Sequence, residues 1–135
     1  MIKTISRHAP PRFNSARRVP RSPAPHPHKT VSSPKDGLLR FVPLGGLEEI
    51  GRNCSFFEYQ NEIVVLDAGI QFPEEETPGI DYIIPNVTYL EARKRNIKAL
   101  IFTHGHYDHI HALPYLLEKL GNPMIYAAAL TRALI

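Results

Sequence analysis

The segment 103–109, Thr-His-Gly-His-Tyr-Asp-His, constrains this chain more than any other feature, because it directly follows the apolar run at residues 97–102. It places three imidazoles and one carboxylate within six residues. An isolated histidine is more often a surface or hydrogen-bonded residue than a ligand. A cluster of this density at the end of a buried strand, however, is typical of a metal site.

The spacing of these side chains indicates the backbone that they need. In a helix, His104 and His106 would lie about 200° apart around the axis and could not share an ion. We therefore predict a loop in which both converge on one cation, while Asp108 and His109 face a neighbouring position. Imidazole and carboxylate groups together suit Zn²⁺, with Mn²⁺ or Mg²⁺ as alternatives.

A pair of such ions defines a class of chemistry. Two ions about 4 Å apart hold a hydroxide near neutral pH and stabilise both the attacking and the leaving oxygen of an in-line displacement. The segment is therefore interpreted as the first half of a two-metal hydrolase site, with phosphodiester hydrolysis as its natural reaction and Asp108 as the catalytic carboxylate. For His111, a supporting contact and no role at all are equally favoured, and the histidines before residue 37 are assigned no ligand role.

From residue 37 onward, short apolar runs alternate with turn formers, which indicates an α/β domain. Gln60 and Asn61 predict a tight turn between two strands. We expect strands at residues 38–44, 53–59, 62–66, 97–102 and 124–127, the third of them buried on both faces. We expect helices at residues 89–95 and 112–120, a further helix beginning at 130–135, and an ordered loop at 71–88.

Residues 1–36 differ in composition from the rest of the chain. They carry eight Lys and Arg against one Asp (net +7), whereas residues 37–135 carry eight basic and twelve acidic residues (net −4). Their seven prolines and lack of apolar runs predict a disordered basic tail. The tail could bind phosphate backbones, act as a solvated leader or, less favoured, direct import into an organelle.

The single cysteine, Cys54, suits a reducing compartment and is expected to be a small packed side chain in a strand. No secretory signal and no run of about 18 uncharged apolar residues is found. We therefore expect a cytoplasmic protein that neither spans nor binds a membrane.

Three segments resemble known sequences. Residues 104–109 resemble the signature of the metallo-β-lactamase superfamily. Residues 44–53 (Leu-Gly-Gly-Leu-Glu-Glu-Ile-Gly-Arg-Asn) and 67–73 (Asp-Ala-Gly-Ile-Gln-Phe-Pro) resemble the RNA-processing branch that contains ribonuclease J. The resemblance extends from about residue 39 to residue 135 and leaves out the tail.

The resemblance implies an αββα sandwich with two Zn²⁺ at the edge between its sheets, and an inserted domain that closes over RNA. His104 and His106 would hold one ion, Asp108 and His109 the other, and Asp67 would support the metal loop through hydrogen bonds. Members of this family degrade and mature RNA by 5′–3′ exonucleolytic and by internal cleavage, and they often form homo-oligomers.

Two departures from the family bear on activity. His111 stands where the family usually has glycine at the start of the following helix. Residues 112–135 contain no His, Asp or Cys, so the remaining ligands would lie beyond Ile135. We therefore expect a truncated amino-terminal part of the sandwich that is inactive and prone to aggregation by itself.

Two alternatives stay open beside a ribonuclease. One is another hydrolase of the superfamily, acting on a thioester, a lactam or a small phosphodiester. The other is a non-catalytic remnant that binds metal or RNA, for which RNA affinity would be salt-sensitive and lost on deletion of residues 1–36.

Overall fold

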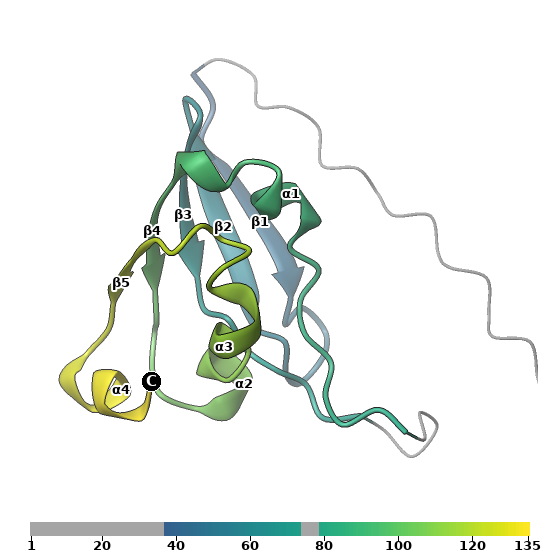
Figure 1. Cartoon of the computed structure of the whole chain (residues 1–135). Helices are drawn as coiled ribbons and strands as arrows, with labels where there is room; N and C mark the ends of the chain where they lie inside the picture. Colours follow the sequence, from purple (N-terminus) through teal and green to yellow (C-terminus); the bar gives the residue numbers. More distant parts are fainter. Residues whose placement is uncertain (1–36, 74–78) are drawn as a thin grey trace, which may run out of the picture. The chain divides into compact units, whose positions relative to one another are not determined.

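The computed structural model describes residues 37–73 and 79–135, which form a sheet with helices against it (Figure 1). The strands are β1 (Arg40–Gly45), β2 (Cys54–Tyr59), β3 (Glu62–Leu66), β4 (Ile97–Ile101) and β5 (Met124–Tyr126). The helices are α1 (Thr88–Glu91), a 3₁₀ turn (Lys94–Asn96), α2 (Tyr107–Ile110), α3 (Leu113–Leu116) and α4 (Ala129–Leu134). The α/β prediction is confirmed, whereas the tail predicted at residues 1–36 lies outside the described residues.

The strands follow one another across the sheet in the order β1-β2-β3-β4-β5. The pairs β1–β2 and β2–β3 are antiparallel, and β3–β4 and β4–β5 are parallel. Gln60 and Asn61 have φ angles of 43° and 75°, the left-handed conformation of a tight hairpin turn, as predicted. Because β3 and β4 run parallel, the residues that follow them meet at one edge of the sheet.

The helices α1, α2 and α3 cover one face of the sheet (Figure 1). Along β2 the side chains alternate, so that Cys54, Phe56 and Glu58 are buried on this face. The hydrophobic core combines Cys54 and Phe56 with side chains of the neighbouring strands and of all three helices. Its largest fully buried members are Phe56, Ile63, Val65, Leu90, Leu100, Leu116 and Leu120.

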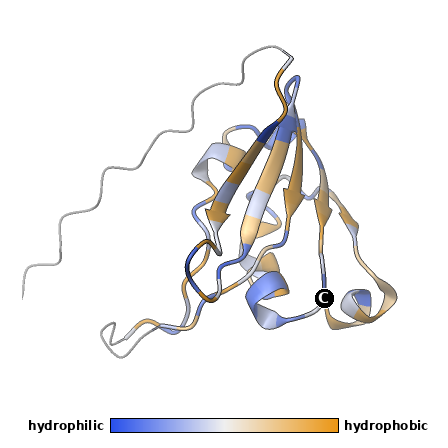
Figure 2. Cartoon of the chain, turned by 180° about the vertical axis from the view of Figure 1, so that it is seen from behind, coloured by the Kyte–Doolittle hydropathy of each residue, from blue (hydrophilic) through white to orange (hydrophobic). Residues whose placement is uncertain are grey.

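On the other face of the sheet, Figure 2 shows hydrophobic positions along the strands, with no helix of the described residues lying across them. They include Phe41, Phe57, Tyr59, Met124 and Tyr126, all of them exposed. On β3 the side chains of this face are only half-buried, so the prediction that β3 is buried on both faces is wrong for the described structure. That the isolated chain aggregates through such surfaces stays a prediction.

Two predicted helices are shorter than their sequence pattern indicates. The helix expected at residues 89–95 is a single turn, α1, followed by the 3₁₀ turn. The helix expected at 112–120 is α3 alone, after which residues 117–121 continue as turns and Gly121, with a φ of 82°, ends them. None of the helices in the described residues is long and apolar enough to cross a membrane.

A buried carboxylate joins the first two strands to α1. Glu58 is fully buried, and its carboxylate forms ion pairs with Arg40 and, at 2.8 Å, with Arg93. The hydroxyl of Tyr89 donates to the same carboxylate at 2.8 Å. Burial and this hydrogen bond raise the pKa of Tyr89, so the phenol remains a donor at neutral pH.

We expect the Glu58→Gln variant to lose about 2–3 kcal/mol in the free energy of unfolding, because two guanidinium groups lose their counter-charge. The loss is smaller than for a fully buried pair because Arg40 and Arg93 are 18% and 20% exposed. Urea unfolding at pH 7 measures it. Glu62→Gln is the matched control: Glu62 and Lys98 lie 3.4 Å apart but are 69% and 54% exposed, so we expect a change within about 0.5 kcal/mol. Equal losses in the two variants would contradict this prediction.

Candidate metal centre

The candidate centre lies where β3 and β4 end at the same edge of the sheet. Asp67 follows β3 directly, with a φ of 59° that Asp and Asn tolerate better than most residues. Its backbone N–H donates to the carbonyl of Ile101 at 2.9 Å. This bond fixes the end of β3 against the end of β4 and brings Asp67 beside the segment that begins at Thr103.

The buried carboxylate of Asp67 holds that segment in place. Its Oδ1 accepts the backbone N–H of Thr103 at 2.8 Å, and its Oδ2 accepts the hydroxyl of Thr103 at 2.9 Å. The same Oδ2 lies 2.9 Å from Nδ1 of His109. One carboxylate therefore orients both ends of the motif, and its contact with Nδ1 leaves Nε2 of His109 available to a ligand or metal.

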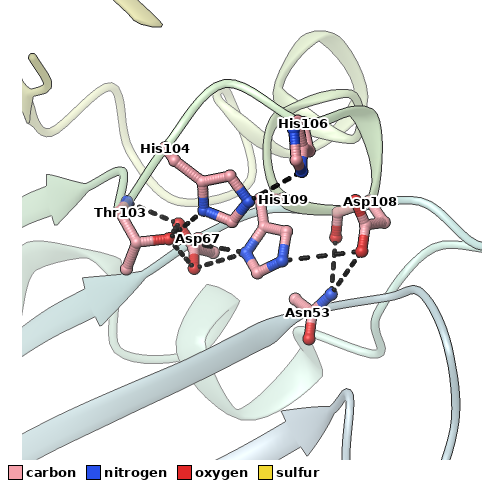
Figure 3. A network of polar contacts seen from close by, with 7 residues as sticks. All are labelled: Asn53, Asp67, Thr103, His104, His106, Asp108 and His109. Atoms are coloured by element: carbon pink, nitrogen blue, oxygen red, sulfur yellow. Dashed lines mark hydrogen bonds and ion pairs between the residues drawn. The ribbon is translucent and has the colours of Figure 1, made fainter.

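The five predicted site residues come together in a single network (Figure 3). Nδ1 of His104 lies 3.0 Å from the hydroxyl of Thr103, which leaves its Nε2 facing Nδ1 of His106 at 3.1 Å. On the other side, Nε2 of His109 lies 3.5 Å from Oδ2 of Asp108. His104 thus contacts His106, and His109 contacts Asp108, while the rings of His104 and His109, with centres 4.0 Å apart, join the two contacts. That each pair binds one ion stays a prediction.

Asn53 positions Asp108 from a distant part of the chain. The backbone N–H and the side-chain amide of Asn53 both donate to the carbonyl oxygen of Asp108, at 3.1 Å each. The side-chain amide also lies 3.0 Å from Oδ2 of Asp108. No sequence pattern predicts this role, because only its place in the resembling segment 44–53 sets Asn53 apart from other asparagines.

The segment 67–70 passes directly beneath α2. The N–H of Ala68 donates to the carbonyl of His109 at 2.8 Å, and the carbonyl of Ala68 accepts the N–H of Ala112 at 2.8 Å. Gly69 lies so close to the carbonyl of Asp108 that a Cβ atom at this position would overlap it. This approach requires glycine for steric reasons, and spacing along the sequence does not reveal it.

The backbone of the motif differs from the predicted loop in its second half. His104 and His106 lie in non-helical backbone, as expected. Asp108 and His109 instead lie in α2, for which His106 is the N-cap residue. Adjacent side chains on a helix project about 100° apart. Asp108 and His109 can therefore still approach each other, and Oδ2 of Asp108 lies 3.5 Å from Nε2 of His109. His111 ends α2 and packs its ring on Tyr107 at 4.3 Å, instead of starting the next helix.

The donor pairs fit divalent metal ions but do not complete a site. Two donors on one tetrahedral Zn²⁺, each about 2.0–2.1 Å from it, lie roughly 3.3 Å apart. The separations of 3.1 Å for His104 and His106, and of 3.5 Å for Asp108 and His109, are close to this value. Within residues 37–73 and 79–135, no three His, Cys, Asp or Glu side chains are placed to hold one ion. Further ligands are needed for each ion.

Cys54 belongs to the hydrophobic core and, in the described part of the chain, to no group of three possible ligands. Burial and the nearby carboxylate of Asp67 raise the pKa of its thiol to about 12. The thiol is therefore protonated at neutral pH when no metal is bound. Cys54 is a buried member of the core at the start of β2, as the sequence predicts.

Comparison with known families gives the class of this site. Residues 47–135 match the metallo-β-lactamase superfamily, which covers the candidate centre, β2 to β5 and all of the helices. The chain belongs to the metallo-β-lactamase superfamily. Proteins of this superfamily use divalent metal ions, in agreement with the paired imidazole and carboxylate donors.

Within the superfamily, the chain is similar to ribonucleases J. It is 51% identical over 106 residues to ribonuclease J 1 of Streptococcus pyogenes, which is 78% of this chain and 19% of that protein. It is 48% identical over 101 residues to ribonuclease J of Thermus thermophilus (72% and 18%) and 44% identical over 97 residues to that of Synechocystis (72% and 15%). The chain therefore spans less than a fifth of the length of these curated relatives.

Proposed function

We propose that this chain forms the amino-terminal part of a metal-dependent ribonuclease that cleaves RNA from the 5′ end and internally, in RNA maturation and decay. The observation that carries the proposal is the pair of donor sets, His104 with His106 and Asp108 with His109, set at separations that suit two neighbouring ions. Similarity to ribonucleases J over most of the chain supports RNA as the substrate. By itself the chain supplies four ligands, too few for two ions, and we expect it to be inactive alone.

Each residue of the centre has a separate part in this proposal. His104 and His106 would hold one Zn²⁺, and Asp108 and His109 would hold the other, with Mn²⁺ or Mg²⁺ as alternatives. When bound, the ions would supply a hydroxide near neutral pH and neutralise charge on the phosphate. Asp108 is assigned as the catalytic carboxylate of this centre. Asp67 orients His109 through Nδ1, and Asn53 fixes the backbone and side chain of Asp108.

The experiment uses the protein produced from its complete coding sequence, with RNA labelled at either end. We expect hydrolysis that is lost after treatment with a chelator and restored by Zn²⁺ or Mn²⁺. Mononucleotide release from the 5′ end reports exonuclease action, and internal fragments report endonuclease action. In the same titration, Asp67→Asn should need about 10- to 100-fold more free metal for half-maximal activity, because His109 loses its carboxylate partner.

The other outcomes separate the alternatives. Turnover of a thioester, a lactam or a small phosphodiester without RNA cleavage would contradict the proposal and indicate another hydrolase of the superfamily. Salt-sensitive RNA binding without hydrolysis, lost on deletion of residues 1–36, would indicate a non-catalytic binding protein. Hydrolysis of RNA that survives complete removal of metal would exclude the metal centre as its source.

The proposal includes a cytoplasmic location and a homo-oligomeric state. A reducing compartment agrees with a single, buried cysteine. Cell fractionation with an antibody to the protein tests the location, and recovery in an organelle would contradict it. Light scattering of the purified protein tests the oligomeric state, and a monomer at micromolar concentration would contradict it.

A further inference from the structure

Exposed aromatic rings occur along α2 and α3, starting within the metal motif itself. Tyr107, His111 and Tyr115 occur at intervals of four residues along these two successive one-turn helices. Tyr107 and His111 are in contact, with ring centres 4.3 Å apart. Tyr107 is 58% exposed and Tyr115 is 44% exposed. Core packing does not explain this series of exposed aromatic rings, which starts between the candidate ligands His106 and Asp108.

A third tyrosine, Tyr82, joins these rings from a distant segment of the chain. The ring of Tyr82, which is 38% exposed, stacks on that of Tyr115 with centres 4.7 Å apart and planes inclined by 28°. The neighbouring residue Ile83 is held by two backbone hydrogen bonds to Gln71, at 2.8 Å and 2.9 Å. Gln71 itself follows the segment 67–70 beneath α2. The stacked pair is therefore fixed to the same backbone that positions Asp67 and Asp108.

The chemistry of these rings favours a nucleobase over an aliphatic ligand. Exposed flat rings that are already in contact with one another accept a further flat ring at little entropic cost. Lys119, four residues after Tyr115, is exposed and offers a cation to a phosphate. The acidic neighbours of the rings in the sequence are Asp81, beside Tyr82, and Asp108, beside Tyr107.

We propose that Tyr82, Tyr107, His111 and Tyr115 form a stacking platform that holds unpaired bases of single-stranded RNA beside the metal centre. This inference rests on the proposed function, because it takes RNA as the ligand. Stacking on aromatic side chains tolerates any base, so the platform would contribute affinity and leave sequence preference weak. The residues of the platform contribute to RNA binding, whereas hydrolysis of the phosphodiester takes place at the metal centre.

The test measures RNA binding and hydrolysis separately in the protein produced from its complete coding sequence. A single-stranded RNA with 2-aminopurine at successive positions is titrated in the presence of a chelator, so that binding is read without cleavage. We expect Tyr82→Ala and Tyr115→Ala each to raise Kd by about tenfold and to abolish the fluorescence quenching of one position. Tyr115→Phe keeps the ring and should stay within about twofold of the unmodified protein. Tyr59→Ala, a tyrosine of equal exposure on the other face of the sheet, should leave Kd unchanged.

An abasic site in the RNA supplies the decisive comparison. If the ring of Tyr115 stacks on a base, removal of that base should remove most of the penalty of Tyr115→Ala. With metal restored, Tyr115→Ala should raise KM by about tenfold and leave kcat nearly unchanged.

An unchanged Kd for RNA in both Tyr82→Ala and Tyr115→Ala would overturn the platform, even if RNA hydrolysis is observed. Binding of a protein partner that both variants lose, with RNA affinity intact, would overturn it as well. Stacking without hydrolysis would instead contradict the proposed function and leave the platform standing.

Discussion

Replacing His106 with alanine is expected to lower RNA hydrolysis at least about a thousandfold, which corresponds to about 4 kcal/mol of lost transition-state stabilisation. His106 lies 3.1 Å from Nε2 of His104 and is exposed at the end of the motif loop. Because its imidazole is exposed, the fold should persist while one ion loses half of the ligands that this chain supplies. Rates of 5′-end release and of internal cleavage, measured with saturating RNA, give the size of the loss.

Two controls separate loss of the metal from loss of the fold. Circular dichroism and the unfolding temperature of His106→Ala should match those of the unmodified protein in the presence of a chelator. His28→Ala removes an imidazole that is assigned no ligand role and should keep full activity. Hydrolysis of RNA by His106→Ala at the normal rate would exclude this imidazole from the centre, and with it the proposed pairing of ligands.

Local patterns account for the parts of the structure that the sequence predicts well. The hairpin of β2 and β3 follows from two apolar runs separated by Gln60-Asn61, and the structure places left-handed residues at both positions. The strand before the motif follows from the run at 97–102, which is apolar except for Lys98. The place of Asp67 follows from the apolar run at 63–66, which it ends. Because β3 and β4 run parallel, these two strand ends necessarily meet, so the network of Asp67 with Thr103 and His109 arises from topology.

The parts that the sequence does not predict depend on contacts between distant residues. Asn53 and Asp108 are 55 positions apart, and no periodicity links them. The α2 turn depends on hydrogen bonds that connect Ala68 with His109 and Ala112, whereas the pattern of the motif alone favours a loop. The predicted helix at 112–120 has a continuous apolar stripe, but four of its last positions adopt turns before Gly121. Hydrophobic spacing indicates which side faces the core and leaves the length of the helix undetermined.

Gly69→Ala is expected to have the largest effect on the architecture of the centre. A Cβ atom at Gly69 would overlap the carbonyl of Asp108, and the peptide group of His109 lies within 2.9 Å of the same point. These neighbours are backbone atoms, so relief requires the segment 67–70 to move away from α2. That movement breaks the hydrogen bond between Ala68 and His109 and shifts Asp108 from Asn53.

We expect Gly69→Ala to lower the free energy of unfolding by about 3 kcal/mol, at the upper end of the range for overpacked sites, and to release metal from the Asp108 and His109 pair. Urea unfolding and the metal content after dialysis measure the two effects. Gly105→Ala is the matched control, because it lies in the same motif and the one close neighbour of its Cβ atom would be the end of the flexible Leu134 side chain, at 2.7 Å, with Thr131 at an ordinary contact distance of 3.6 Å. Neither glycine has a positive φ, so the comparison isolates steric contact from backbone strain. A loss confined to Gly69→Ala would mean that the close passage of 67–70 beneath α2 holds the centre together, whereas equal behaviour of the two variants would contradict that role.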